Sequence, residues 1–360
     1  MQFGISVTSL FLLVVTALPL SHHPHWLVRS ADFPRLQFAS LALALWLVAA
    51  VALPFDSAWH WLVLANATVC LCWQLCWILP YTPLWRKQVL ASSAKEHTAQ
   101  ITILTCNVLT SNRNVEALLS LVARHEPDVL VTLESDQWWQ DRLDALERTM
   151  PHSIKCPLDN LYGMHVYSRL PLDEPTIEFL VEDDVPSMHA LLRMRNGASV
   201  RMHFLHPAPP SPTENERSSE RDAELLVVAK SVAGCAGPII VTGDLNDVAW
   251  SSTTRMFRKV SGLLDPRVGR GMFNTFHAGI PLLRWPLDHV FHSAHFRLAK
   301  IDRLPSIGSD HFPLLARLSL QRESVDEQDS IAMDAAARDR ADAIVREQGV
   351  ATRDVPAPGE

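Results

Sequence analysis

Three long apolar stretches lie at the beginning of the chain, separated by short connectors. They cover about residues 4–20, 36–54 and 59–79, and none of them contains Lys, Arg, Asp or Glu. A helix needs about 20 mainly apolar residues to cross the hydrocarbon core of a bilayer. The pattern therefore predicts a transmembrane region over residues 1–90 with three spans. Two spans are an alternative because the first stretch is short, and a signal peptide is disfavoured because no basic residue precedes that stretch.

From residue 99 the pattern changes to short β-branched runs and longer amphipathic runs. The amphipathic runs predict helices over residues 114–125, 137–147 and 218–232. The β-branched and apolar runs predict strands over residues 100–107, 128–133, 164–168, 190–194, 199–205, 238–242, 286–292 and 313–320. Because strands outnumber helices, we expect a mixed α/β layered domain over residues 99–320, preceded by a linker at 91–98.

Charge follows the same division of the chain. The net charge is -7, with 48% hydrophobic and 20% charged residues, which excludes a wholly disordered chain and a generally basic nucleic-acid coat. Six cysteines are too few for a disulfide scaffold. Residues 321–360 hold five basic and ten acidic residues. This acidic tail is predicted to be disordered or to form a transient helix.

Polar residues follow several of the predicted inner strands. A buried strand that ends on a carboxylate needs a partner for that charge, and ligands bind at strand ends in α/β sheets. Carboxylates, amides and histidines that converge there would suit a hard divalent cation and a phosphate, because Mg²⁺ prefers oxygen ligands. The residues are Asn107, Glu134, His206, Asp244, Asn246, Asp288, Asp310 and His311.

The motifs LTCNV, LVTLES, LHPAPP, VTGDLND, PLDHVF and GSDHFPL occur in this order between residues 99 and 320. Each is weak alone, but together they resemble the endonuclease/exonuclease/phosphatase superfamily, which includes deoxyribonucleases, inositol polyphosphate phosphatases and neutral sphingomyelinases. Within it, the chain looks like a bacterial membrane-anchored branch. The resemblance implies a four-layer α/β/β/α sandwich, deoxyribonuclease-like, behind about three transmembrane helices. It also implies a metal-dependent hydrolase of phosphodiester bonds.

The resemblance further implies roles for individual residues. Asp244 would orient or deprotonate the attacking water, His311 would contact the phosphate oxygen that gains charge, and Asp288 would fix that histidine. Leu109 stands where some nucleases of the family carry an Asp, which weakens the case for a second metal ligand there. The implied ligands of Mg²⁺, or of Mn²⁺, are Asn107, Glu134 and Asp310. The implied catalytic residues are His206, Asp244, Asn246, Asp288 and His311.

Basic residues in the short loops predict the orientation of the spans. Arg29 and Arg35 lie in the first connector, and Arg86, Lys87 and Lys95 follow the third span. With three spans the first connector and the catalytic domain share one side of the membrane. The positive charge predicts that this side is cytoplasmic, in an integral multi-pass protein of a bacterial inner membrane.

A basic stretch in the otherwise acidic domain is the only signal for the substrate. Arg255, Arg258, Arg270 and Arg284 are predicted to bind a phosphate-rich substrate, although a solvated face would explain them equally well. Nucleic acid is placed slightly ahead of a phospholipid or sphingomyelin head group. A membrane-tethered binding module without catalysis is the remaining alternative. Besides the substrate and the lipid bilayer, the sequence indicates no protein partner.

Overall fold

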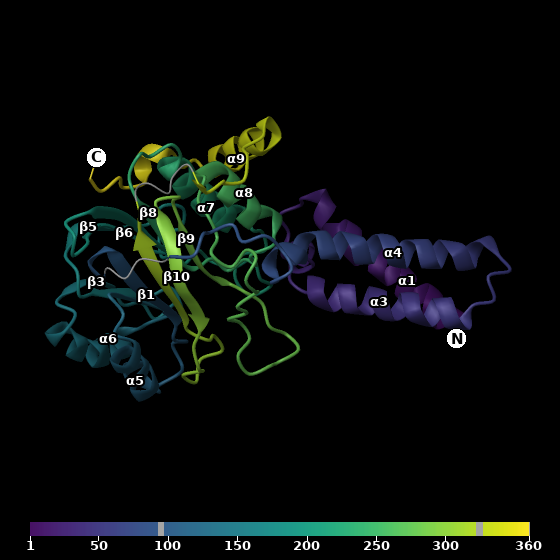
Figure 1. Ribbon diagram of the computed structural model, residues 1–360, viewed down its shortest axis with the longest axis horizontal. Helices are drawn as coiled ribbons and strands as arrows, with labels where there is room; N and C mark the ends of the chain where they lie inside the picture. Colours follow the sequence, from purple (N-terminus) through teal and green to yellow (C-terminus); the bar gives the residue numbers. More distant parts are fainter. Residues whose placement is uncertain (93–96, 322–326, 360) are drawn as a thin grey trace.

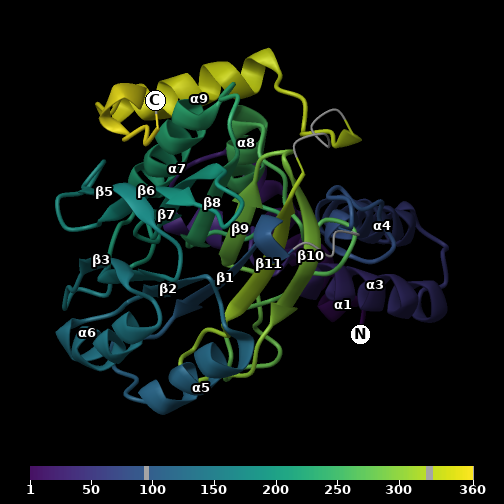
Figure 2. The ribbon, with the colours of Figure 1, turned by 60° about the vertical axis from the view of Figure 1, so that its left-hand side comes forward.

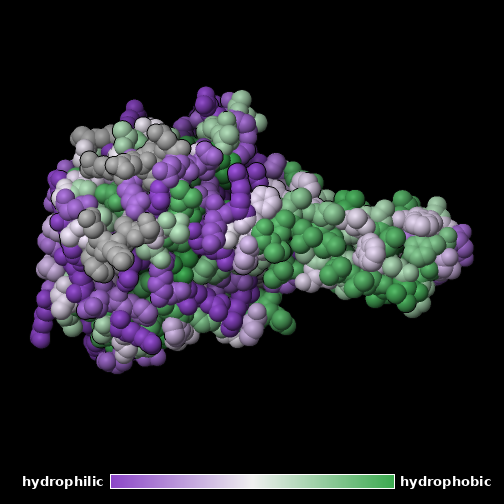
Figure 3. All heavy atoms as spheres, in the orientation of Figure 1, coloured by the Kyte–Doolittle hydropathy of each residue, from purple (hydrophilic) through white to green (hydrophobic). Residues whose placement is uncertain are grey.

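A computed structural model describes residues 1–92, 97–321 and 327–359. Three helices form an elongated bundle at one end of the molecule (Figure 1). They are α1 (Gln2–Ala17), continued by the 3-10 turn η1 (Leu18–Ser21), α3 (Arg35–Ala52) and α4 (Ala58–Ile78). Each is long and apolar enough to cross a membrane. The three predicted spans therefore correspond to three helices, and their outer surface is mainly apolar (Figure 3).

The rest of the chain contains two mixed β-sheets. The first has the strand order β10-β11-β1-β2-β4-β3, and the second has the order β5-β6-β7-β8-β9. Only β1 with β2 and β7 with β8 pair in parallel among the described strands. The bounds of the first sheet are β1 (Gln100–Asn107), β2 (Val129–Leu133), β3 (His152–Cys156), β4 (Met164–Ser168), β10 (Phe296–Arg303) and β11 (Leu314–Leu320). Those of the second are β5 (Leu172–Glu178), β6 (Ser187–Arg193), β7 (Ser199–Leu205), β8 (Ile239–Asp244) and β9 (Asp288–His292).

Helices cover the outer face of each sheet (Figure 2). The first sheet packs against α5 (Val115–His125) and α6 (Gln137–Leu143), and the second against α7 (Ser219–Val232) and α8 (Ser252–Ser261). This arrangement confirms the predicted α/β/β/α sandwich. The remaining short elements are α2 (Trp26–Ser30) and the 3-10 turns η2 (Leu79–Tyr81), η3 (His97–Ala99), η4 (Asp144–Arg148) and η6 (Thr352–Asp354).

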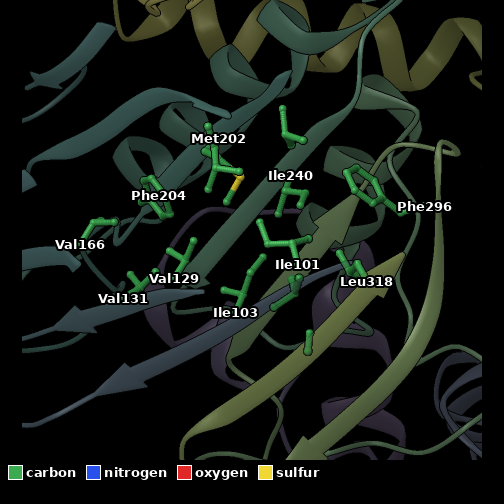
Figure 4. Packing of buried hydrophobic residues seen from close by; sticks show 14 of the residues in the cluster. Ile101, Ile103, Val129, Val131, Val166, Met202, Phe204, Ile240, Phe296 and Leu318 are labelled. Carbon is green, nitrogen blue, oxygen red and sulfur yellow. The ribbon is translucent and has the colours of Figure 1, made fainter. Parts of the chain in front are cut away.

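The main hydrophobic core lies between the two sheets (Figure 4). Along β1, Ile101 and Ile103 point into this core, whereas Leu104 and Cys106 point toward α5 and α6. Alternate side chains of a strand face opposite sides of the sheet. Because both faces of β1 are covered, its sequence is almost continuously apolar. The C-terminal ends of the inner strands β1, β2 and β8 lie on the same side of the core, so the residues that end or follow these strands can come close together.

The elements that the sequence did not predict are mostly at the edges of the sheets. β3, β5 and β10 are all edge strands. Their side chains are less buried than those of the inner strands, with exposed positions in β5 and β10. Edge strands carry polar and charged residues that discourage pairing with other chains. They consequently lack the apolar run that identifies an inner strand.

The described part of the tail contains a helix, which is one of the two alternatives that the sequence leaves open. Residues 335–347 form α9 (Ala335–Glu347), which packs beside α7 and α8. Ala341 and Val345, one helical turn apart, are buried in the core beneath these helices. Lys230 of α7 also binds Asp342 at 2.6 Å. A narrow face of two small residues is enough for docking, although it is too narrow to stand out in the sequence. Residues 322–326 and 360, and residues 93–96 of the predicted linker, lie outside the described residues.

The bundle and the α/β domain meet through several buried contacts. The Tyr81 hydroxyl donates to the Ala249 carbonyl at 2.5 Å, and Trp250 Nε1 donates to the Asp32 carbonyl at 2.9 Å. Arg29 and Arg35 are buried here, and both pair with Asp32. The predicted orientation of the spans rests partly on the positive charge of these two arginines. In the structure they also stabilise the junction between the bundle and the domain.

Candidate functional site

The predicted site residues come from strand ends in both sheets. Asn107 ends β1, Glu134 follows β2, and Asp244 and Asp288 pair with each other at the ends of β8 and β9. The two sheets are linked near this edge by a 2.8 Å hydrogen bond between the buried hydroxyls of Thr105 in β1 and Thr242 in β8. The side chains two residues further along these strands, Asn107 and Asp244, therefore meet.

The backbone turns sharply where these strands end. Glu134 and Asn246 have positive φ angles of 55° and 50°, which is uncommon for residues other than glycine. Such conformations persist where the surrounding structure enforces them, often at functional sites. Gly243 has a φ of 150°, and a Cβ there would lie 1.9 Å from the Leu205 carbonyl oxygen. The glycine of the GDLN motif thus allows β7 and β8 to pair closely beside Asp244.

Asn107 connects two of the carboxylates. Its Nδ2 donates to Glu134 Oε1 at 2.7 Å and lies 3.2 Å from Asp244 Oδ2. Its Oδ1 accepts from the backbone N–H of Leu109 at 3.0 Å, which orients the amide. In this geometry Asn107 acts as a donor that positions the carboxylates, and it does not present an oxygen to a cation.

His311 lies between two aspartates. Its Nδ1 is 2.8 Å from Asp288 Oδ2, and its Nε2 is 3.4 Å from Asp244 Oδ2. The three residues are almost completely buried. Phe276 packs against the His311 ring with 4.9 Å between the ring centroids. Asp288 therefore fixes the ring, while the long contact at Nε2 leaves that proton available to another acceptor.

Burial and neighbouring charges set the protonation of these groups. Burial alone would lower the pKa of His311, but the charges of Asp244 and Asp288 outweigh it and raise that pKa to about 10. Burial raises the pKa of Asp244 above its ordinary value, although His311 opposes this shift. Burial also raises the pKa of Glu134 to about 7, against the hydrogen bond from Asn107. At neutral pH the site thus holds a protonated histidine among carboxyl groups.

His206 and Asn246 stand on the side of the second sheet. His206 follows β7 and is 2% exposed, and burial lowers the pKa of its imidazole to about 4, so the ring is neutral. Its Nδ1 is buried without a hydrogen-bond partner. The Asn246 N–H donates to Asp244 Oδ1 at 2.9 Å, and its side chain donates to the Pro207 carbonyl at 3.0 Å. These contacts hold Asp244 and leave His206 with unused hydrogen-bonding capacity.

Two sets of residues could accommodate a cation. Oxygens of Asp244 and Asp288 and a ring nitrogen of His311 lie within 4.8 Å of one another. Protonated His311 already donates to Asp288 through Nδ1, however, so we regard this set as a hydrogen-bonded group. Glu134 Oε2, in contrast, is buried without a partner among the described residues, and the charge of Asp310 reaches Glu134 and raises its pKa. An unpartnered carboxylate oxygen beside a second carboxylate fits a hard divalent cation.

The basic stretch does not converge on this site, which corrects the predicted substrate-binding role of Arg258 and Arg270. Arg258 is buried and bonds the Tyr81 hydroxyl and Gln88, while Arg270 bonds the carbonyls of Pro266 and Val89. These guanidinium groups serve the contact between the domain and residues 81–89.

The other two arginines of the stretch occupy different places. Arg255 is exposed, with its guanidinium 5.7 Å from the centre of the Trp77 ring. Only Arg284 lies near the site, on the loop that carries Phe276, where it bonds the carbonyls of His277 and Ala278.

Sequence reasoning missed two aromatic residues at the site. Tyr162 packs on His206 with 5.5 Å between ring centroids, and its hydroxyl bonds Glu214. Phe276 covers His311 from the loop before β9. Both lie in irregular segments, where hydrophobic periodicity gives no signal. Only proximity in sequence to the LDH motif could have pointed to Phe276.

Solved structures with a similar fold support this architecture. The human Nocturnin catalytic domain with bound sulfate anion matches with a TM-score of 0.52 and 16% identity, over 62% of this chain and 95% of that one. An endonuclease/exonuclease/phosphatase from Beutenbergia cavernae matches at 0.50 and 16%, over 62% and 72%. D. rerio TDP2 complexed with single strand DNA product matches at 0.50 and 15%, over 61% and 99%. At such identities the likeness shows the fold alone.

The sequence itself carries the family assignment. No match is found among the curated proteins. The family model for the Endonuclease/Exonuclease/phosphatase family matches residues 104–311, which include every strand-end residue described above. Because this match spans more than half of the 360 residues, the chain belongs to the Endonuclease/Exonuclease/phosphatase family.

Proposed function

We propose that this protein is a metal-dependent phosphodiesterase held at a membrane by α1, α3 and α4. The observation that carries the proposal is the buried Asp244–His311–Asp288 group beside Glu134, whose Oε2 has no partner. Enzymes of this family are hydrolases of the nuclease and phosphodiesterase type and use a divalent metal. The arrangement provides an acid–base group and an oxygen ligand within one site.

Mg²⁺, or Mn²⁺, would be held by Glu134 and Asp310, with Asn107 positioning the Glu134 carboxylate. When bound, the cation supplies positive charge to the phosphoryl oxygens. Asp244, when ionised, can accept a proton from the attacking water, because its burial raises its pKa and so strengthens it as a base.

Protonated His311 donates from Nε2 to the phosphoryl oxygen that gains negative charge. Asp288 holds the ring through Nδ1, so this donor is already oriented before the charge develops. Neutral His206 offers a second donor through its unpartnered Nδ1. Asn246 holds Asp244 in place through its backbone N–H.

Nucleic acid is the first candidate substrate. D. rerio TDP2, of similar fold, is complexed with a single strand DNA product, and the human Nocturnin domain binds a sulfate anion. The same fold thus accommodates phosphate-like groups. Support from the basic stretch is lost, however, because Arg258 and Arg270 bond within the protein.

A phospholipid or sphingomyelin head group is the second candidate, and the loop before β9 favours it. Ile280, Leu282 and Leu283 of this loop are 43%, 82% and 42% exposed. Gln37, in the first turn of α3, donates to the Leu282 carbonyl at 2.7 Å. The loop therefore lies level with the start of a proposed span (Figure 1). Since Phe276 of the same loop covers His311, these contacts support a site that opens near the bilayer surface.

We further propose that the protein is an integral multi-pass membrane protein of the bacterial inner membrane with its catalytic domain in the cytoplasm. The connector with α2 and the catalytic domain lie at the same end of the bundle (Figure 1). Arg86 and Lys87 are exposed there. Cysteine labelling from either side of sealed vesicles, with one cysteine introduced in the described part of the tail, tests the orientation.

The full chain in lipid nanodiscs allows the substrate classes to be compared directly. Bis-p-nitrophenyl phosphate, single-stranded DNA and sphingomyelin or phosphatidylcholine would each be supplied with Mg²⁺ or with EDTA. We expect metal-dependent hydrolysis that His311→Ala reduces by at least about 10²-fold. His125→Ala, at the end of α5 outside the site, is the matched control. Absence of hydrolysis of every substrate would favour the non-catalytic binding module.

A further inference from the structure

We propose that a single anionic phospholipid binds in a cavity between α4 and the catalytic domain. The cavity has a volume of about 1010 Å³ and is lined by the last turns of α4, residues 79–90, α8 and residues 327–332. None of its lining residues belongs to the site formed by the strand ends. The proposal requires the three helices to lie in a bilayer, but it does not require phosphodiesterase activity.

One wall of the cavity is an apolar groove along α4. Cys72 and Cys76 are exposed, lie one helical turn apart and flank Leu75. Their small side chains leave space that a larger residue would fill. At about 1.5 Å per residue, Cys72 lies roughly 13 Å along the chain from Tyr81, whose hydroxyl binds the catalytic domain. The groove therefore extends from the domain surface to the depth at which acyl chains begin.

The opposite end of the cavity carries positive charge. Arg86, Lys87 and Arg255 are exposed, and none of them forms an ion pair among the described residues, although the charge of Arg255 also acts on Asp334. Arg255 is held against the Trp77 ring. Of the two acidic residues in the lining, Glu327 pairs with Arg297, and Asp329 remains. Cations at a bilayer surface attract anionic lipids.

The order of these features identifies the class of ligand. Apolar surface lies toward the middle of the proposed span, Trp77 and Trp85 lie at its end, and the cations lie beyond them. A phospholipid has the same order of acyl chain, interface and charged head group. A soluble phosphate compound would match the cations and would leave the groove along Cys72 and Cys76 without a partner. We therefore assign the cavity to a lipid of the surrounding bilayer, with a negatively charged head group.

Native mass spectrometry of the full chain in detergent tests this assignment. The protein would be titrated with phosphatidylglycerol or phosphatidylcholine in EDTA, so that metal-dependent hydrolysis consumes neither lipid. We expect the wild type to retain phosphatidylglycerol about tenfold better than phosphatidylcholine, and the variant R86Q/K87Q/R255Q to lose this preference. The control R124Q/R148Q/R338Q removes three exposed arginines elsewhere, so it changes the net charge equally and should keep the preference.

A second variant, Cys76→Phe, fills the groove while leaving the cations intact. It should reduce retention of phosphatidylglycerol severalfold even if the triple variant cannot be purified. Equal loss of preference in both triple variants would show a general charge effect and overturn the proposal. Retention of the preference in R86Q/K87Q/R255Q would overturn it as well. So would competition by inorganic phosphate at millimolar concentration, because it would show that the acyl chain contributes nothing.

Discussion

The sequence indicates two charged regions of the α/β domain for binding a phosphate-containing substrate, the strand ends and the basic stretch, and the fold treats them in opposite ways. Asp244, Asp288 and His311 come from distant parts of the chain and lie within hydrogen-bonding or near-contact distance. Arg258 and Arg270 lie close together in the sequence, and their guanidinium groups bond to Tyr81, Gln88 and Val89 instead.

The difference has a simple physical origin. A residue at the end of an inner strand is placed by the register of the sheet, so its position follows from the strand pattern. The arginines sit on α8 and on the loops that follow it, where neither the helix face nor the loop path is fixed by a local pattern. A long guanidinium group also satisfies nearby carbonyls readily. A basic stretch in the sequence therefore indicates where charge lies along the chain but not where the side chains point. The position of a residue at the end of an inner strand predicts which other residues it lies beside.

The largest effect is expected for Asp288→Asn at the strand-end site. Loss of the carboxylate would leave His311 without its orienting partner and would lower the pKa of the imidazole, which Asp288 helps to raise. By analogy with other Asp–His pairs, turnover should fall on the order of 10³-fold or more. The pH–rate profile should also change shape, which a purely structural loss would not cause. An unchanged profile with wild-type turnover would contradict the role of Asp288.

A large loss of stability is expected for Arg267→Gln, between Arg258 and Arg270 in the sequence. Arg267 is 1% exposed and binds both oxygens of Asp265 at 2.9 Å. Burial would raise the pKa of Asp265, but Arg267 outweighs it and lowers that pKa to about 2. Removing one partner of a buried pair costs about 3–5 kcal/mol of unfolding free energy. Arg193→Gln, at the exposed pair with Asp173, should cost less than about 1 kcal/mol in the same denaturation experiment.

A smaller effect is expected for Arg258→Gln, which separates the two explanations of the basic stretch. Arg258 lies at the junction, and losing its bonds to Tyr81 and Gln88 should cost about 1–3 kcal/mol. The KM for DNA and its salt dependence should stay unchanged. A raised KM with a reduced salt slope would instead restore the predicted role in substrate binding.

The smallest effect is expected from a buried carboxyl group outside the site. Glu224 of α7 is 1% exposed, and its burial, with nearby Glu182, raises its pKa to about 8 from an ordinary value of 4.5. The folded state thus holds a proton that the unfolded chain releases above pH 4.5, so stability from this group is lost as pH rises toward 8. Glu224→Gln should raise the melting temperature at pH 8 and change it little at pH 4.5. An equal shift at both values would contradict this.

Much of the fold follows from sequence because buried strands and apolar helices carry strong patterns. β1, with both faces covered, begins and ends at the predicted residues. The edge strands β3, β5 and β10 are not predicted, and α9 is expected only as a transient helix, since each buries only a narrow face. The site residues are found through motifs at strand ends, but Tyr162 and Phe276 depend on the paths of loops. The roles of Arg258 and Arg270 depend on the junction with residues 81–89, which no local pattern reveals.

The most direct test compares the Mg²⁺ dependence of wild-type protein with that of Glu134→Gln and Arg258→Gln, using bis-p-nitrophenyl phosphate and the full chain in nanodiscs. We predict no turnover by the wild type in EDTA and saturable activation by Mg²⁺. Glu134→Gln should lose this activation, because it loses the unpartnered carboxylate oxygen, while Arg258→Gln should keep it. Wild-type activation in Glu134→Gln, or full turnover in EDTA, would contradict a metal-assisted site at the strand ends.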